Sequence, residues 1–283
     1  MERGLMRDPG RRVSCGSPVE IFADYHTHTV HSHGTGTVAD NVSAAARRSL
    51  EEVAITDHGP ANLFGVGLLE EEELDEIRQE VEEARRSFPG VRVLLGVEAN
   101  ITGLSGRLDV SPRRLEGLDV VLAGLHMPVL PRPLDEGAFL LLGNLLSNWS
   151  RALSRKMRVA NTKAAVEAVS RNRVDVFVHP GLRMDIDTEE LARVCARHGT
   201  ALEINAGHCH IGVDFVRRAA AWGADFVICS DSHSPERVGD FGRALSLARE
   251  ARLPVEKILN SRSGGSNSRP DKPRYGFRPP SGR

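Results

Sequence analysis

The chain has 283 residues, of which 40% are hydrophobic and 27% charged, a mix typical of a folded globular protein. Its 37 Lys and Arg residues balance 38 Asp and Glu residues, so the net charge of −1 argues against a general nucleic-acid binder. The four cysteines form no C-x-x-C pair, which is typical of a reduced, cytoplasmic protein. The most apolar run, FLLLGNLL, is far shorter than the ~20 residues of a membrane span, so no membrane association is expected.

Residues 1–20 come first and are expected to be disordered, because they are charged and lack the apolar stretch of a secretory signal. From residue 22 onward, short apolar runs alternate with helix-like segments. The runs are nearly continuous in Val, Ile and Leu, which predicts strands buried on both faces, as in a parallel sheet. These predicted strands are 22–28, 52–58, 91–99, 118–126, 174–180, 201–205 and 224–233.

Helices are expected between these strands, at 38–51, 70–88, 187–199, 213–223 and 236–251. In the third of these, Asp187 is a predicted N-cap and Gly199 a predicted exit residue. Repeated alternation of strand and helix predicts one α/β domain over residues 21–262. About seven strand–helix units favour a barrel rather than an open sheet.

Two segments depart from this alternation. Residues 128–161 are longer than a normal connection, and we interpret them as an extra helix packed on the barrel rather than a lid or an oligomer contact. Residues 263–283 are rich in Gly, Ser, Pro and Arg, which predicts a disordered basic tail.

Metal-ligand residue types follow six of the seven apolar runs. They are His26 and His28, Asp57 and His58, Glu98, His126, His179, and Asp231 and His233. The carboxyl ends of barrel strands form one face, and residues i and i+2 of a strand point the same way. Imidazole and carboxylate together suit Zn, Mn or Fe. A single histidine here would more often be a core residue, so the prediction of a metal site rests on the whole set.

The motifs around these residues resemble those of the PHP (polymerase and histidinol phosphatase) family. The matching pieces are DYHTHT, SHG, AITDHG, GVEANI, AGLH, VHPG, EIN and SDSH, which together cover about residues 22–262. The resemblance implies a distorted (β/α)7, TIM-like barrel that holds two or three divalent metals and hydrolyses phosphoesters. It is strongest for the stand-alone bacterial phosphatases that resemble histidinol-phosphatase.

The resemblance also implies a ligand set. A first metal would be held by His26, His28, Asp231 and a bridging Glu98, a second by Glu98, His126 and His179, and a third by His33, His58 and His233. We choose His33 because SHG matches the family's loop position, although His31 stays open as an alternative. Glu98 and Asp231 would also moderate the charge of the cluster and orient a metal-activated hydroxide.

Three further residues are candidate substrate contacts. Arg132 and Arg183 follow two strands and could each clamp a phosphate, although a solvated arginine is the commoner case for either alone. Arg183 is favoured because it follows His179 by four residues. His208 lies after the sixth strand, where it lines the substrate pocket or covers its rim.

The favoured function is hydrolysis of a small phosphomonoester, with a phosphorylated small molecule as the partner. The alternative is a PHP nuclease or phosphodiesterase acting on nucleotides or DNA ends, although the balanced charge makes a nucleic-acid partner the weaker expectation. A non-catalytic domain is disfavoured by the intact ligand set. An amidohydrolase is disfavoured because no lysine ends a predicted strand. Homo-oligomerisation is left open.

Overall fold

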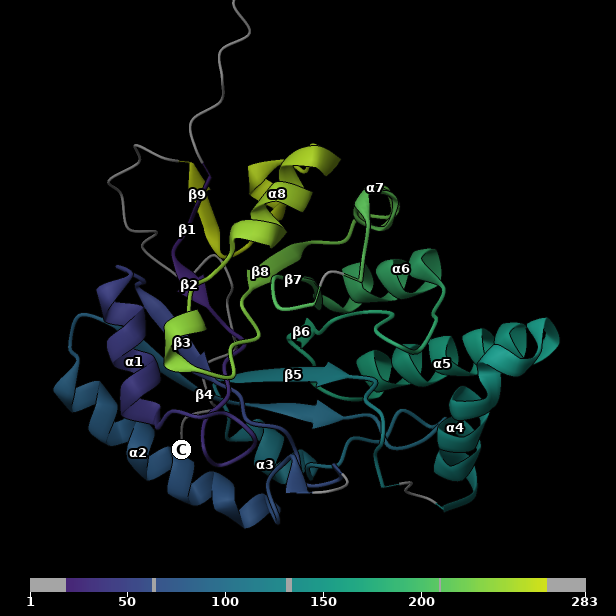
Figure 1. Ribbon diagram of the computed structural model, residues 1–283, viewed down its shortest axis with the longest axis horizontal. Helices are drawn as coiled ribbons and strands as arrows, with labels where there is room; N and C mark the ends of the chain where they lie inside the picture. Colours follow the sequence, from purple (N-terminus) through teal and green to yellow (C-terminus); the bar gives the residue numbers. More distant parts are fainter. Residues whose placement is uncertain (1–18, 63–64, 131–133, 209, 264–283) are drawn as a thin grey trace, which may run out of the picture.

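A computed structural model describes residues 19–62, 65–130, 134–208 and 210–263 (Figure 1). Its main sheet has seven parallel strands, and each pairs with the next along the chain. A bridge between Thr27 and Ser232 joins the two edges of this sheet. The predicted seven-stranded α/β barrel is therefore confirmed, as a nearly closed barrel of β2 (Ala23–Asp24), β3 (Glu52–Ile55), β4 (Arg92–Asn100), β5 (Val120–Gly124), β6 (Val176–Phe177), β7 (Ala201–Asn205) and β8 (Phe226–Cys229).

Helices surround this sheet and connect successive strands (Figure 1). The longer helices turn apolar residues to the barrel, as α2 does with Leu74, Ile77 and Val81. Asp187 is the predicted N-cap of α6, accepting from the backbone N–H groups of Glu189 and Glu190, and Gly199 ends this helix at a φ of 73°. The connecting helices are α1 (Val38–Arg47), α2 (Leu74–Ser87), α3 (Pro112–Glu116), α5 (Arg151–Arg171), α6 (Thr188–His198), α7 (Val213–Ala221) and α8 (Gly242–Ala251).

The long segment 128–161 contributes one additional helix, α4 (Leu134–Leu146), and the short turn η3 (Ser147–Trp149) before α5 begins. Figure 1 shows α4 beside α5 at one edge of the molecule. Asn144 and Asn161 join the two helices through two reciprocal amide hydrogen bonds of 2.8 Å. Gly143 permits the close approach, since a Cβ at this position would lie 2.3 Å from Sδ of Met157. The segment thus contains a packed helix, as expected.

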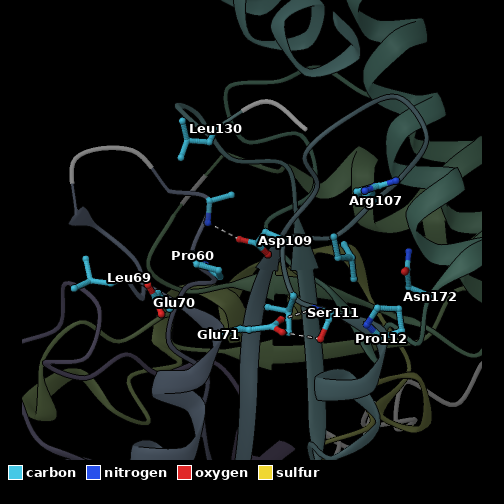
Figure 2. Close-up of a pocket in the computed structure, with 13 residues that line it drawn as sticks. Pro60, Leu69, Glu70, Glu71, Arg107, Asp109, Ser111, Pro112, Leu130 and Asn172 are labelled. Atoms are coloured by element: carbon cyan, nitrogen blue, oxygen red, sulfur yellow. Dashed lines mark hydrogen bonds between the residues drawn. The ribbon is translucent and has the colours of Figure 1, made fainter. Parts of the chain in front are cut away.

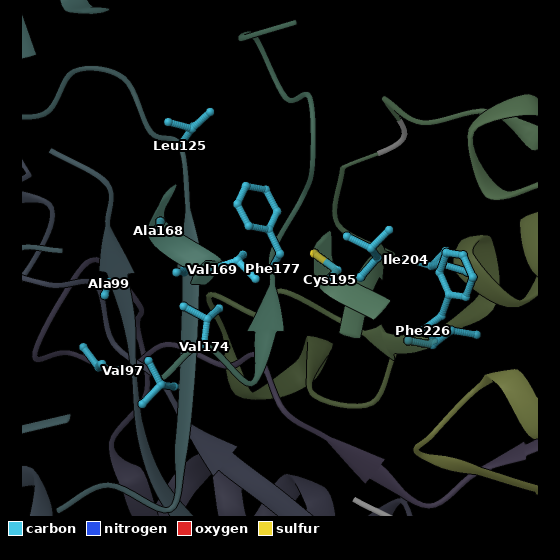
Figure 3. Packing of buried hydrophobic residues seen from close by; sticks show 14 of the residues in the cluster. Val97, Ala99, Leu125, Ala168, Val169, Val174, Phe177, Cys195, Ile204 and Phe226 are labelled. Carbon is cyan, nitrogen blue, oxygen red and sulfur yellow. The ribbon is translucent and has the colours of Figure 1, made fainter. Parts of the chain in front are cut away.

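Two apolar clusters fill the space on either side of the sheet. Figure 3 shows part of the larger cluster, in which Val97, Phe177 and Ile204 lie between the strands and the helices. The smaller one lies inside the barrel and includes Leu94 and Leu122. Because side chains alternate along a strand, the same strands supply both clusters, which is why their sequences are nearly continuous in apolar residues.

A two-stranded antiparallel ribbon outside the barrel was not predicted. It pairs β1 (Val19–Ile21) with β9 (Ser261–Ser263), so that Val19 lies opposite Ser263. Residues 19, 20 and 263 were expected to belong to disordered segments, but they are paired in this ribbon. Residues 1–18 and 264–283 lie outside the described residues, and for them the expected disorder stays a prediction. Among the helices that the structure describes, none is long and apolar enough to cross a membrane.

Candidate metal centre

The carboxylate of Glu98 lies at the centre of a group of five histidines. It is fully buried in β4, and its Oε2 lies 3.2 Å from His26 Nε2, 3.4 Å from His28 Nε2 and 2.8 Å from His58 Nδ1. Its other oxygen, Oε1, lies 2.8 Å from His126 Nε2 and 2.7 Å from His179 Nε2. The two oxygens therefore face two different groups of imidazoles, the arrangement of a bridging ligand.

Asp231 closes the first of these groups from the opposite edge of the sheet. Its Oδ1 lies 3.5 Å from His26 Nε2 and 3.4 Å from His28 Nε2. The loops after β2 and β8 are held together here, since the N–H of His28 donates to the carbonyl of Ser232 at 2.8 Å. Closure of the barrel thus brings two residues 203 positions apart, His28 and Asp231, into one site.

The rings of His33, His58 and His233 gather on a third side of the cluster. The ring centroid of His33 lies 4.9 Å from that of His58 and 4.1 Å from that of His233. His31 points elsewhere, and its Nε2 lies 2.9 Å from Oε1 of Glu80 on α2. Of the two loop histidines that the sequence left open, the structure brings His33 and not His31 to the cluster.

Asp57 explains why the loop carrying His33 has this shape. Its carboxylate accepts from both the N–H and the hydroxyl of Thr29 at 2.7 Å, and from the hydroxyl of Ser32 at 2.5 Å. These three bonds fix the loop directly beside His58, the next residue along the chain. The sequence placed Asp57 among the metal-ligand residue types that follow strands. In the structure its carboxylate holds this loop and is not one of the side chains that face each other in the cluster.

Two residues of the cluster have left-handed backbone conformations that favour glycine. The φ angle is 28° at His179 and 52° at Asp231. Such conformations cost on the order of 1–3 kcal/mol each and persist where surrounding contacts hold them. Each lies two residues after the end of a strand, β6 or β8, so the backbone turns sharply there and directs the side chain into the barrel mouth.

The charges of the cluster suit cation binding. Burial alone would raise the pKa of Glu98, but His58, His26 and His126 together hold it well below its usual value. The pKa of Asp231 is lowered in the same way. Burial opposes the ionisation of this carboxyl group, but His26 and His28 hold its pKa well below the usual value. Burial lowers the pKa of His33 and of His126 to about 4. At neutral pH both carboxylates are charged and both rings present a lone pair.

The polar atoms left without partners support this interpretation. Within the described residues, buried atoms lacking a hydrogen bond include Nε2 of His26, both ring nitrogens of His28 and Oε2 of Glu98. Buried polar atoms are nearly always paired, so a group of unpaired ones facing each other is suited to bind a shared cation. Three sets of donors lie within 4.8 Å of one another, namely His28, His58 and His233; His26, His28 and Glu98; and His58, Glu98 and His126. The residues present thus fit divalent metals.

The candidate substrate contacts lie less close to the cluster than the predicted metal ligands do. His208 lies at the edge of the cluster, with Nε2 3.4 Å from Oδ2 of Asp231 and 45% of its side chain exposed. Arg183 is exposed at a φ of 59°, and no ion pair joins it to the cluster in the part of the chain that the structure describes. Arg132 lies outside the described residues. Of the two candidates that the structure describes, His208 alone is brought to the site.

The sequence analysis missed Glu203 and Asn205, two buried polar residues of β7. Glu203 Oε1 lies 2.7 Å from His26 Nδ1, and Asn205 Nδ2 donates to Oδ2 of Asp231 at 2.9 Å. Their spacing of two residues places both side chains on the inner face of the barrel. The sequence signal for these two roles is the presence of two polar residues inside the apolar run ALEIN. The motif match assigned no role to either residue.

Two hollows larger than 400 Å³ lie near the cluster in the part of the chain that the structure describes. One of about 430 Å³ is lined by Asn205, His208, Ile211 and the first turns of α8, and so adjoins Asp231. The larger one, about 750 Å³, contains none of the predicted ligands. Figure 2 shows it around Asp109, whose carboxylate accepts from the N–H of Ala61 at 2.9 Å and thereby braces the loop after His58.

A nearly closed parallel barrel with a buried histidine–carboxylate cluster at the carboxyl ends of its strands defines a TIM-like barrel protein whose cluster is suited to metal binding. The chain belongs to the PHP family, since its residues 24–207 match the PHP domain. Among its relatives, a "Probable phosphatase" of Shewanella sp. (strain MR-4) is 32% identical over 84% of this chain and 86% of the relative. "Probable phosphatase YcdX" of Shigella flexneri is 30% identical over 84% and 89%.

Solved structures show the same fold. A histidinol phosphate phosphatase from Lactococcus lactis, in complex with zinc, L-histidinol and phosphate, superposes with a TM-score of 0.55 at 16% identity, over 83% of this chain and 92% of that one. A putative histidinol phosphatase from Listeria monocytogenes gives a TM-score of 0.54 at 15% identity, over 77% and 97%. At such identities these likenesses concern the fold alone.

Proposed function

We propose that this protein is a metal-dependent phosphatase that hydrolyses a small phosphomonoester. The observation that carries this proposal is the carboxylate of Glu98, whose two oxygens face five histidines at 2.7–3.4 Å in a buried site. The relatives that share most of the chain's length and are named probable phosphatases support the choice of reaction.

In this proposal the nine clustered residues hold two or three divalent metals. His26, His28, Asp231 and Glu98 would hold the first, Glu98, His126 and His179 the second, and His33, His58 and His233 the third. Zinc is favoured among Zn, Mn and Fe because the related Lactococcus lactis enzyme was solved with zinc. Metals bound here lower the pKa of water and offset the negative charge of phosphoryl oxygens.

The chain's own residues would set the geometry. Glu98 is buried and fixed from five sides, so it holds the two groups of imidazoles at a constant separation. Asp231 lies at the open side of the cluster, where Oδ2 faces His208. His208 is half-exposed there and is the described residue best placed to reach a bound phosphate. Arg183 and Arg132 remain candidates for clamping the phosphate from the loops.

The hollow of about 430 Å³ beside His208 supports a small substrate. It shares His208 and Asn205 with the surroundings of Asp231, and its wall includes the apolar side chains of Ile211 and Leu247. Small-molecule pockets commonly measure 300–1,000 Å³. We place the alcohol part of the ester in this hollow, with its phosphate directed toward Asp231.

A substrate panel tests this function directly. The metal-loaded protein is incubated with phosphomonoesters, phosphodiesters and single-stranded DNA, and the released phosphate or shortened DNA is measured. We expect turnover of monoesters that disappears with a chelator and returns with added metal. Preferential cleavage of diesters or DNA would overturn the phosphatase assignment in favour of the nuclease alternative.

A further inference from the structure

Glu203 is a completely buried carboxylate that belongs to none of the three predicted metal positions. It lies in the middle of β7, the one barrel strand whose end supplies no predicted ligand. We propose that Glu203 is a positioning residue that sets the affinity of the first and second metal positions together. This inference rests on the proposed metal centre and adds a residue to it.

The first contact of Glu203 fixes the tautomer of His26. Its Oε1 lies 2.7 Å from His26 Nδ1, and both side chains are fully buried. A carboxylate can only accept, so Nδ1 carries the proton and donates. The lone pair of His26 is then on Nε2, the atom that faces Glu98 and Asp231. A carboxylate behind a metal-binding histidine also makes the ring a stronger ligand.

The second contact holds the backbone of His179. The N–H of His179 donates to Glu203 Oε2 at 2.6 Å, at the residue whose φ of 28° lies in the left-handed region. A conformation of this kind requires a contact that offsets its cost. The bond keeps Nε2 of His179 at 2.7 Å from Oε1 of Glu98, on the side of the second metal position.

A third contact extends the effect of Glu203 to Asp231. The amide of Asn205 donates one N–H to Glu203 Oε2 at 3.0 Å and the other to Asp231 Oδ2 at 2.9 Å. Both residues are buried, so the two bonds are shielded from water. One carboxylate thereby orients His26, His179 and Asp231, which come from three different strand ends and serve two metal positions.

Glu203→Gln tests this role because it keeps the shape of the side chain. A glutamine has one accepting oxygen and one donating NH2 group, so it cannot accept from both His26 and His179. Loss of such a supporting group typically lowers metal affinity 10–100-fold. We expect a loss of about this size at two positions, while the third position, held by His33, His58 and His233, keeps its affinity.

Glu52→Gln is the matched control. Glu52 is also a buried barrel carboxylate, but it begins β3 at the far end from the cluster, where it accepts from Tyr25 and Arg92. Its replacement should lower the unfolding temperature of the metal-free protein and leave metal affinity unchanged. Asn205→Ala is a second, milder variant. It removes the amide that links Glu203 to Asp231, together with the bond that this amide accepts from the N–H of His208, and should weaken the first position alone.

The experiment uses the full chain, freed of metal by a chelator and dialysed against graded concentrations of free Zn²⁺. Bound zinc per chain is measured for each variant, alongside the unfolding temperature of the metal-free form. Zinc-binding curves of Glu203→Gln and Asn205→Ala that superpose on that of the wild type would overturn the proposal, even if both variants unfold at lower temperature. Because the readout is metal binding, it remains decisive if the wild type hydrolyses no phosphomonoester.

Discussion

At the scale of single residues, the site depends on one buried charge. A carboxylate without compensation is very costly to bury, and Glu98 is compensated by the imidazoles that face both of its oxygens. These partners come from loops after four different strands. The position of Glu98 is therefore defined by the tertiary fold as a whole, and its chemistry is sensitive to small displacements of any of these loops.

Glu98→Gln should lower kcat at least ~10²-fold, because it removes the charge that faces two groups of ligands and leaves the shape of the side chain unchanged. Removal of one key electrostatic group has effects of this size in other enzymes. The measurement is kcat on the best monoester of the panel, with bound metal quantified in parallel. Full activity together with full metal content in this variant would rule out the bridging role.

His33→Ala should lower the metal content by up to one equivalent per chain, since its ring lies against His58 and His233. His31→Ala is the matched control, because His31 pairs with Glu80 on α2. Elemental analysis of both purified variants gives the result. If His31→Ala lost metal and His33→Ala kept it, the assignment of the loop would have to be exchanged.

Residue patterns could predict the cluster because its histidines and Asp231 lie shortly after strands and Glu98 lies near the end of β4, where apolar runs make them conspicuous. They could not separate His31 from His33, since both lie in one polar loop and only the bonds of Asp57 decide how that loop turns. Nor could they assign Glu203, which lies inside a strand. Its role depends on His26 and His179, contacts that only the closed barrel creates.

At the scale of elements, β4 and β7 have the lengths that the sequence predicted, but the other strands are shorter. The apolar runs 22–28 and 174–180 contain strands of only two residues, β2 and β6. The remaining residues leave the sheet and carry His26, His28 and His179 inward. The apolar pattern reports burial, which continues past the last paired residue, and so it predicts where strands lie better than where they end. The ribbon of β1 and β9 was missed because its residues are partly polar.

Asn144→Ala should destabilise the protein by about 1–3 kcal/mol, because Asn161 would be left with unpaired amide groups in a buried helix contact. The kcat should stay near that of the wild type, since the side chain of Asn144 bonds to α5 and within α4 and contacts none of the predicted ligands. Chemical denaturation and kcat are the two measurements, and Asn148→Ala, at an exposed position of η3, is the control. A kcat changed several-fold at unchanged stability would instead indicate that α4 acts as a lid.

At the scale of the whole molecule, the cluster joins β4 to the loops that follow five of the other six barrel strands. Metal ions that bind only the folded form should therefore stabilise the entire chain. Saturation at 1,000 times Kd contributes ~4 kcal/mol, which corresponds to an increase in Tm of about 8 °C or more. Thermal unfolding with and without a chelator measures this. An unchanged Tm would contradict a site that spans the barrel.

Removal of residues 264–283 should leave the turnover of a small substrate unchanged, because the composition of this segment predicts disorder. The cut falls after Ser263, so β9 and its pairing with β1 are retained. Steady-state kinetics of the shortened chain provide the test. A large fall in kcat/KM would mean that the segment contributes to the site.

The pairing of β1 with β9 brings the first and last described residues of the chain side by side. Val19 and Ser263 are opposite partners in that ribbon, so a short peptide can join them. New termini can then be opened at the exposed turn around Gly90, between α2 and β4, where the structure has open space. The order in which the seven strands are synthesised would change while their neighbours stay the same. Such a circular permutant should fold to the same barrel and bind the same complement of metal.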